Sequence, residues 1–318
     1  MAREHSFRNT VAMMSSLSLP IMAIITFLLW VIGPKWDREL WGTLVLVGLM
    51  TYTIVEWNNQ CQLLRIRSRM NSVTFLAFLC AFPALHTKGL AFIPAFCLLA
   101  AYFMLFKAYG EYKPQGYVFH GFFFLSLGSL FFPPLLLLAP TLFVSTNVQL
   151  RILTLKSFSA LLIGLILPYW LYIAAMCVAV PVWGVEETRM RYLDFHLPDY
   201  STLAPWHWGA LAFIGILTFV AVVHFVSTSY NDKIRTRQYF YTMLISFVPI
   251  IFMALWWPED IMITLPLLLL NLTPFVAHYL ALAKSQSMTF FFWMWLIMLV
   301  TLGAFNHLDL WSRLPLSF

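Results

Sequence analysis

The chain has 318 residues, of which 61% are hydrophobic and only 10% are charged. Soluble domains carry about 25% charged residues, so this composition excludes a soluble globular protein. It predicts an all-α, polytopic integral membrane protein in which residues 1–318 form a single transmembrane domain without a separate soluble domain. The partner of such a chain is the lipid bilayer. We therefore interpret the excess of 19 Lys and Arg over 13 Asp and Glu as an orientation signal, not as a nucleic-acid-binding surface.

Apolar segments follow one another along the chain, and a helix needs about 20 apolar residues to cross a hydrocarbon core of about 30 Å. The segments predicted to span are Val11–Ile32, Gly89–Phe106, Phe158–Val182, Trp206–Val226, Tyr239–Trp257, Ile261–Ala283 and Met288–Phe305. Two shorter candidates are Trp41–Val55 and Val73–Leu85. The chain contains no two glycines four residues apart, so it lacks the GxxxG helix-packing motif.

The run Tyr117–Ser145 has no Lys, Arg, Asp or Glu and is interrupted by Pro133, Pro134 and Pro140. It fits a single kinked helix, a re-entrant pair or a hairpin of two short helices. The re-entrant pair and the hairpin both return the chain to the side from which it entered. With either of them, one side of the membrane holds 13 of the 19 cations but only four of the 13 acids. Cytoplasmic loops carry such an excess of Lys and Arg. We therefore favour a short, Pro-broken hairpin at 117–145, about eleven membrane segments in all, an N-terminus inside and a C-terminus outside.

The stretch VEWNNQCQLLRIRSRMN, Val55–Asn71, is polar and lies on the predicted inner side. Because Trp41–Val55 is too short to cross, we expect its helix to continue through Glu56 and Asn58–Gln60. A carboxylate inside the membrane is costly and by default marks a functional site. Other polar side chains are predicted at the same depth, and together they form a candidate substrate or transport site: Glu56, Asn59, His120, His224 and His278. The alternative is that each is an interfacial residue bonded to a neighbouring carbonyl or to water.

The predicted outer face carries most of the acids. A carboxylate cluster there would act as a base or bind a divalent ion, and the candidate catalytic residues are Asp37, Glu39, Glu187 and Asp194. A solvated loop is the alternative for these residues. No set of His, Cys, Asp and Glu has the spacing of a metal site, and no phosphate-binding loop, HExxH or nucleophile elbow is present. Any cofactor is therefore unknown.

Three segments, NNQCQLLRIRSRMNSVTFLAFLCAFPALH, FHGFFFLSLGSLFFPPLLLLAP and TLKSFSALLIGLILPYW, together resemble an uncharacterised family of bacterial multi-pass inner-membrane proteins. The resemblance extends from about Trp41 to Trp170. It implies a helical protein of the bacterial cytoplasmic membrane and does not indicate a biochemical activity. GFFFLSLGSLFFPPLLLLAPTLF, followed by a basic turn and GLILPYWLYI, is also similar to polyprenyl-phosphate-dependent membrane glycosyltransferases. In those enzymes a long first external loop carries an essential acid, whereas the corresponding loop here, GPKWDREL, is short.

Three classes of function follow. We expect a multi-pass inner-membrane protein without an identified activity, acting as a non-catalytic component of envelope biogenesis. A lipid-linked sugar glycosyltransferase would use the external carboxylates. A transporter or flippase would use the broken hairpin and the polar residues around Glu56. Protein partners do not follow from the sequence.

Overall fold

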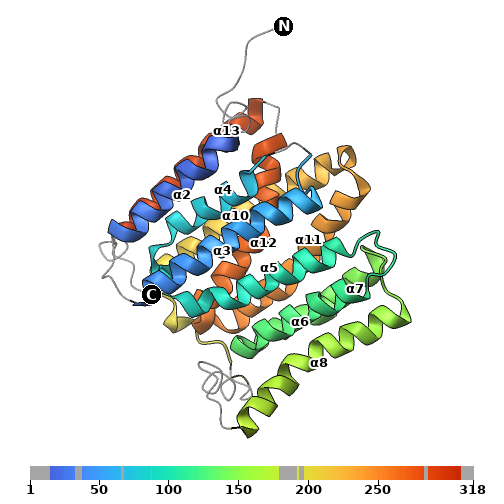
Figure 1. Cartoon of the computed structure of the whole chain (residues 1–318). Coiled ribbons are helices and arrows are strands. Elements are labelled where there is room, and N and C mark those ends of the chain that lie inside the picture. Colours follow the sequence, from blue (N-terminus) through green and yellow to red (C-terminus); the bar gives the residue numbers. More distant parts are fainter. Residues whose placement is uncertain are drawn as a thin grey trace. The chain divides into compact units, whose positions relative to one another are not determined.

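The computed structural model describes residues 15–32, 38–65, 68–86, 88–178, 192, 197–282 and 286–308. These ranges contain eleven α-helices and several short 3-10 helices, and no strand occurs in them (Figure 1). The predicted all-α fold is thus confirmed. Six helices are long and apolar enough to cross a membrane: Leu40–Cys61, Gly89–Lys107, Leu155–Cys177, Pro205–Asn231, Ile234–Trp256 and Pro258–Ala281. Helices suit such a chain because each bonds its own backbone groups where no water is present.

The chain forms two compact units, which are described separately. Unit 1 comprises Met1–Leu90, Ser201–Lys233 and Leu269–Phe318. Its helices are α2 (Ser15–Ile32), α3 (Arg38–Cys61), α4 (Met70–Ala81), α10 (Pro205–Thr228), the later part of α12 (Ile261–Leu282) and α13 (Gln286–His307). Helix α4 has 12 residues, most of them buried, and packs against α2, α3 and α13. A helix this short is tolerated at membrane depth because protein surrounds it.

Unit 2 comprises Ala91–Tyr200 and Ile234–Leu268. Its helices are α5 (Phe92–Lys107), α6 (Gln115–Phe131), α7 (Leu138–Val148), α8 (Leu155–Cys177), α11 (Ile234–Trp256) and the start of α12. Figure 1 shows α6 and α8 side by side, in green and yellow-green. Helix α8 begins at a local signal in the sequence, because the Thr154 hydroxyl accepts a hydrogen bond from the Ser157 N–H at 3.1 Å.

Helices α6 and α8 run in the same direction. The Ser126 hydroxyl of α6 donates to the Leu165 carbonyl at 2.6 Å, and Ser129 hydrogen-bonds Tyr169 at 2.7 Å. Later residues of α6 therefore meet later residues of α8. Since the two helices are parallel, the chain must return between them, through the 3-10 helix η3 (Pro133–Leu137) and α7.

One backbone turn recurs three times, where an aromatic residue precedes a proline: at Phe82-Pro83, Phe132-Pro133 and Trp257-Pro258. The aromatic residues end α4, α6 and α11 with similar backbone angles, φ/ψ of −124/76°, −138/87° and −118/70°. A proline clashes with a helical residue before it, so the helix stops there. Each proline then opens a 3-10 helix, whose first turn is closed by the carbonyl of the aromatic residue.

Helix α3 runs past the apolar segment Trp41–Val55 as expected from the sequence. It continues through Glu56 and Asn58–Gln60 to Cys61, which gives it 24 residues. At about 1.5 Å per residue this is enough to cross a hydrocarbon core of about 30 Å. The chain then leaves the helix at Gln62, whose φ of 52° is left-handed. The polar end of α3 therefore lies directly beside the basic loop 62–69.

Candidate functional site

A buried carboxylate, Asp232, lies in unit 1 shortly after the end of helix α10. Helix α10 ends at Thr228, and a 3-10 turn over Ser229–Asn231 leads to Asp232 in an extended conformation. The Asp232 N–H donates to the Ser229 carbonyl at 2.9 Å, which closes this turn. The Asp232 side chain is only 1% exposed. An ionised carboxylate withdrawn from water in this way needs charged or hydrogen-bonding partners.

Two partners approach the two oxygens of Asp232. The Arg65 Nε lies 3.0 Å from Oδ1, and the His278 Nε2 of α12 lies 2.9 Å from Oδ2. An ionised carboxylate accepts but does not donate hydrogen bonds, so the His278 Nε2 carries the proton in this pair. Arg65 is 39% exposed in its side chain, whereas His278 is 1% exposed. The carboxylate therefore joins a partly hydrated cation to a fully buried imidazole.

The two loops around Asp232 bind each other reciprocally. Arg65 also donates from Nη1 to the Asn231 carbonyl at 3.3 Å, and the Lys233 Nζ donates to the Gln62 Oε1 at 3.2 Å. Each loop thus supplies a cation to an acceptor in the other. We call Gln62, Arg65, Asn231, Asp232, Lys233 and His278 the Asp232 cluster. It connects the end of α3, the end of α10 and the last turn of α12 at one place.

His224, one of the predicted site residues, lies beside this cluster. Its ring centroid is 5.7 Å from that of His278 and 5.0 Å from that of Tyr279. The residue is 5% exposed, and neither of its ring nitrogens has a hydrogen-bond partner in the described part of the chain. An imidazole with two unpaired polar atoms in a buried position is energetically costly. It is therefore a position at which a hydrogen-bonding group from outside the protein would be stabilised.

The structure brings two of the five predicted transport residues together. His224 and His278 meet beside Asp232, as described above. Glu56 is half-buried and accepts a hydrogen bond from Gln60 on the next turn of α3, and Asn59 is exposed. His120 is exposed on α6 in unit 2. Of the predicted catalytic carboxylates, Asp37, Glu187 and Asp194 lie outside the described residues, as does the side chain of Glu39.

Sequence reasoning missed Asp232, although a signal was present. The segment RIRSR at Arg65–Arg69 and the segment KIRTR at Lys233–Arg237 share one pattern of charge, isoleucine and hydroxyl residue. The first copy begins four residues after the end of α3, and the second begins five residues after the end of α10 and continues into α11. Asp232 stands directly before the second copy and is the one acid in the segment 227–238. A repeated basic motif with a single adjoining acid is the signal in the sequence for an ion pair between the two copies.

A second polar cluster in unit 1 consists of Trp30, His86 and His307. The rings of Trp30 and His86 are 4.2 Å apart and those of His86 and His307 are 6.0 Å apart. The His307 Nε2 lies 3.0 Å from the Cys80 carbonyl. His86 is 1% exposed. Burial lowers the pKa of His86 from 6.5 to about 3, despite a hydrogen bond to the Leu79 backbone that raises it.

This burial predicts a loss of stability in acid. Between the unfolded pKa of 6.5 and the folded pKa of about 3, the unfolded chain binds a proton that the folded chain does not, so stability falls as the pH falls. We expect a loss of about 2 kcal/mol in the free energy of unfolding from pH 7 to pH 5. Unfolding in mixed detergent micelles at both pH values measures it. His86→Gln should remove this loss, and the exposed His120→Gln should retain it; equal pH dependence of His86→Gln and the parent chain would contradict the prediction.

Within the described residues, no group of three His, Cys, Asp or Glu side chains is placed to hold a metal ion. The Asp232 cluster itself offers charge pairing between the protein's own side chains. Comparison of the chain with family models, with curated proteins and with solved structures finds no match.

Proposed function

We propose that the chain is a multi-pass protein of the bacterial inner membrane with about eleven membrane segments, its N-terminus inside and its C-terminus outside. The six long helices and four shorter apolar helices support this number. The parallel direction of α6 and α8 supports two passes for residues 117–145. The excess of cations in the loops 62–69 and 227–238 supports the cytoplasmic side for the Asp232 cluster.

The biochemical function that the geometry supports best is that of a transporter or flippase with a gate at the Asp232 cluster. The observation that carries this proposal is Asp232, buried between Arg65 and His278 at the end of three helices. Ionisable groups in such positions mark transport pathways and proton relays in membrane proteins. The non-catalytic role in envelope biogenesis is the second candidate. It is favoured by the same contacts, since a cluster that joins two loops and a helix also serves as a structural connection.

The gate follows from the charges of the cluster. Asp232 holds Arg65 by its negative charge, and without that charge Arg65 is exposed enough to be hydrated on its own. The loops 62–65 and 229–233 are then joined by the Lys233–Gln62 hydrogen bond and by the bond from Arg65 to the Asn231 carbonyl. Separation of these loops opens the ends of α3 and α10. The cluster thus acts as a gate on the cytoplasmic side.

Distance measurements between spin labels test this gate without knowledge of a substrate. One label replaces Asn59 and the other replaces Tyr230, because both positions are exposed and both belong to unit 1. In lipid nanodiscs we expect the label distance to be longer in Asp232→Asn than in the parent chain. Glu56→Gln is the matched control, because it removes a carboxylate of the same unit and should keep the label distance of the parent chain.

Two outcomes separate the candidate functions. An Asp232→Asn label distance equal to that of the parent chain would contradict the gate and leave the structural connection. Mass-spectrometric profiling of envelope lipids and polyprenyl-linked intermediates, in cells with and without the gene, then identifies the process. If a lipid-linked glycan accumulates in cells without the gene, and cells with the Asp232→Asn variant accumulate it too, a flippase is supported. If Asp37→Asn and Glu187→Gln reproduce it instead, the glycosyltransferase is supported.

A further inference from the structure

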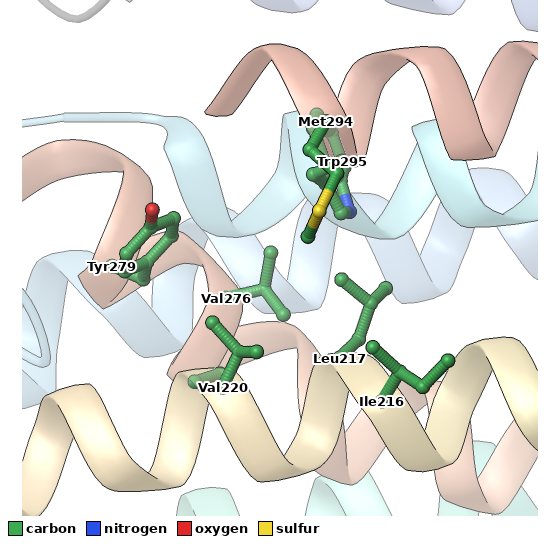
Figure 2. A pocket seen from close by; sticks show the side chains of 8 residues that line it. Ile216, Leu217, Val220, Val276, Tyr279, Met294 and Trp295 are labelled. Atoms are coloured by element: carbon green, nitrogen blue, oxygen red, sulfur yellow. The ribbon is translucent and has the colours of Figure 1, made fainter. Parts of the chain in front are cut away.

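A small apolar pocket lies between α10, α12 and α13 of unit 1. Figure 2 shows Leu217 and Val220 of α10, Val276 of α12 and Trp295 of α13 among the side chains that line it. Its volume of about 10 Å³ is at the limit for a single water molecule, and an apolar lining does not retain one. The pocket is therefore part of the packed core, and a ligand site in unit 1 requires polar groups.

Two histidines meet at the opposite end of unit 1 from the Asp232 cluster. Helix α12 ends beside that cluster, and α13 then extends over 22 residues, or about 33 Å. Its last residue, His307, is exposed, whereas His86 is 1% exposed. Their ring centroids are 6.0 Å apart. One imidazole is thus accessible from the surface and the other is enclosed by protein.

Both rings are oriented by the end of helix α4. An aromatic–proline turn stops this helix, so its last carbonyls lack partners within the helix. The His307 Nε2 lies 3.0 Å from the Cys80 carbonyl, and the His86 ring hydrogen-bonds the Leu79 backbone. A carbonyl only accepts hydrogen bonds, so each ring donates from the nitrogen that it directs at α4.

The second nitrogen of each neutral ring then carries a lone pair and no proton. In His86 this nitrogen is Nε2, which is buried and has no hydrogen-bond partner in the described residues. In His307 it is Nδ1. Histidines that ligate a metal usually donate their other N–H to a backbone carbonyl or a carboxylate in this way. The pair therefore presents two lone pairs that one metal ion would bind.

The spacing of the rings fits one metal ion between them. An imidazole nitrogen lies about 2.0–2.1 Å from Zn²⁺, which places the ring centroid about 3.2 Å from the metal. Two such rings are about 5.2 Å apart at a tetrahedral angle and about 6.4 Å apart in a linear arrangement. The observed 6.0 Å lies between these values. Neither backbone therefore needs to move for both rings to reach one ion.

We propose that His86 Nε2 and His307 Nδ1 bind one first-row transition-metal ion, Zn²⁺ or Cu²⁺. Imidazole suits both ions, and Cu²⁺ is bound more tightly by a given set of ligands. The exposed side of His307 leaves the remaining coordination positions to water. Trp30 is 0% exposed and packs on His86 with ring centroids 4.2 Å apart, so it covers the inner side. The site goes beyond the proposed gate and does not depend on it.

Titration of the full chain with Cu²⁺, in detergent and without a histidine tag, tests this site together with electron paramagnetic resonance. We expect one Cu²⁺ per chain with the spectrum of two coordinated imidazole nitrogens. His86→Gln and His307→Gln should each weaken binding at least tenfold and leave the signature of one imidazole. Glutamine at 307 still donates to the Cys80 carbonyl, so this variant keeps the contact with α4. His120→Gln is the matched control, because it removes an exposed histidine of unit 2, and it should bind as the parent chain does.

Each outcome bears on the proposal. A single coordinated imidazole in the parent chain, or unchanged Cu²⁺ affinity in His307→Gln, would overturn the site. Zn²⁺ should raise the thermal unfolding midpoint of the parent chain but not that of His307→Gln, and an equal rise in both would also contradict it. If His86→Gln does not fold, His307→Gln decides, because its side chain is exposed. Asp232→Asn keeps both histidines and should bind Cu²⁺ as the parent does, so the metal site and the gate can fail separately.

Discussion

Replacing Asp232 with alanine is expected to lower the free energy of unfolding by about 3 kcal/mol, since removal of one partner from a buried ion pair costs about 3–5 kcal/mol. The lower end applies because Arg65 is 39% exposed in its side chain and regains water. The remaining cost comes from His278, which loses the acceptor of its Nε2–H in a position that is 1% exposed. Reversible unfolding in mixed micelles, monitored by circular dichroism, measures the change.

Two variants control this prediction. Asp232→Asn keeps the shape and an acceptor oxygen, so its loss should be smaller than that of Asp232→Ala. Glu56→Ala removes a half-buried carboxylate from the same unit whose hydrogen bond comes from Gln60 on its own helix, and it should change stability by less than about 1 kcal/mol. A loss for Glu56→Ala equal to that for Asp232→Ala would show that the Asp232 cluster has no special role in stability.

Replacing Gly164 with alanine is expected to separate α6 from α8. A Cβ at this position would lie 2.6 Å from the Phe119 carbonyl oxygen and 3.2 Å from the Phe123 nitrogen. Both are backbone atoms of a helix, which cannot move as a flexible side chain does. Overpacking of this kind costs about 1–3 kcal/mol, and Gly164→Leu should cost more than Gly164→Ala. The same unfolding measurement applies.

Gly116 provides the matched control in the same pair of helices. A Cβ at Gly116 meets no protein atom within 4 Å, so Gly116→Ala should be neutral or should stabilise α6 by up to about 1 kcal/mol, the difference in helix propensity. The two glycine substitutions are therefore expected to change stability in opposite directions. A Gly164→Ala chain as stable as the parent would contradict the close approach of α6 and α8.

The length of α3 illustrates what could be predicted from local rules. The apolar segment Trp41–Val55 is too short to cross a membrane, and this argument alone placed Glu56 and Asn58–Gln60 on the helix, as the structure shows. The ends of α4, α6 and α11 at Phe82, Phe132 and Trp257 are likewise local, because each precedes a proline.

The close contact of α6 and α8 illustrates what could not be predicted. The absence of glycines four residues apart removes the best known packing motif, yet Gly164 lies against the backbone of α6. A single glycine in an apolar helix carries no sign of its partner. The sequence separation of Phe119 and Gly164 leaves many other neighbours possible for both.

Among the polar residues of the site, two could be predicted from the sequence and one could not. His224 and His278 could be selected from the sequence, because each interrupts an apolar segment near its predicted inner end. Asp232 was missed, because an acid in a basic loop is explained equally well by contact with water. Its partners Arg65 and His278 are 167 and 46 residues away in the chain, and apart from the repeated basic motif nothing in the sequence connects them.

The sequence by itself determined the class of this protein and the approximate positions of its helices, because hydrocarbon requires each segment to bond its own backbone and therefore depends on composition and length. It also determined which loops carry the positive charge. Only the tertiary structure decided which polar side chains meet, that α6 and α8 run parallel, and that α10, α12 and α13 enclose a pocket. These features depend on the packing of helices that are distant in the chain, and apolar surfaces of similar composition do not specify their partners.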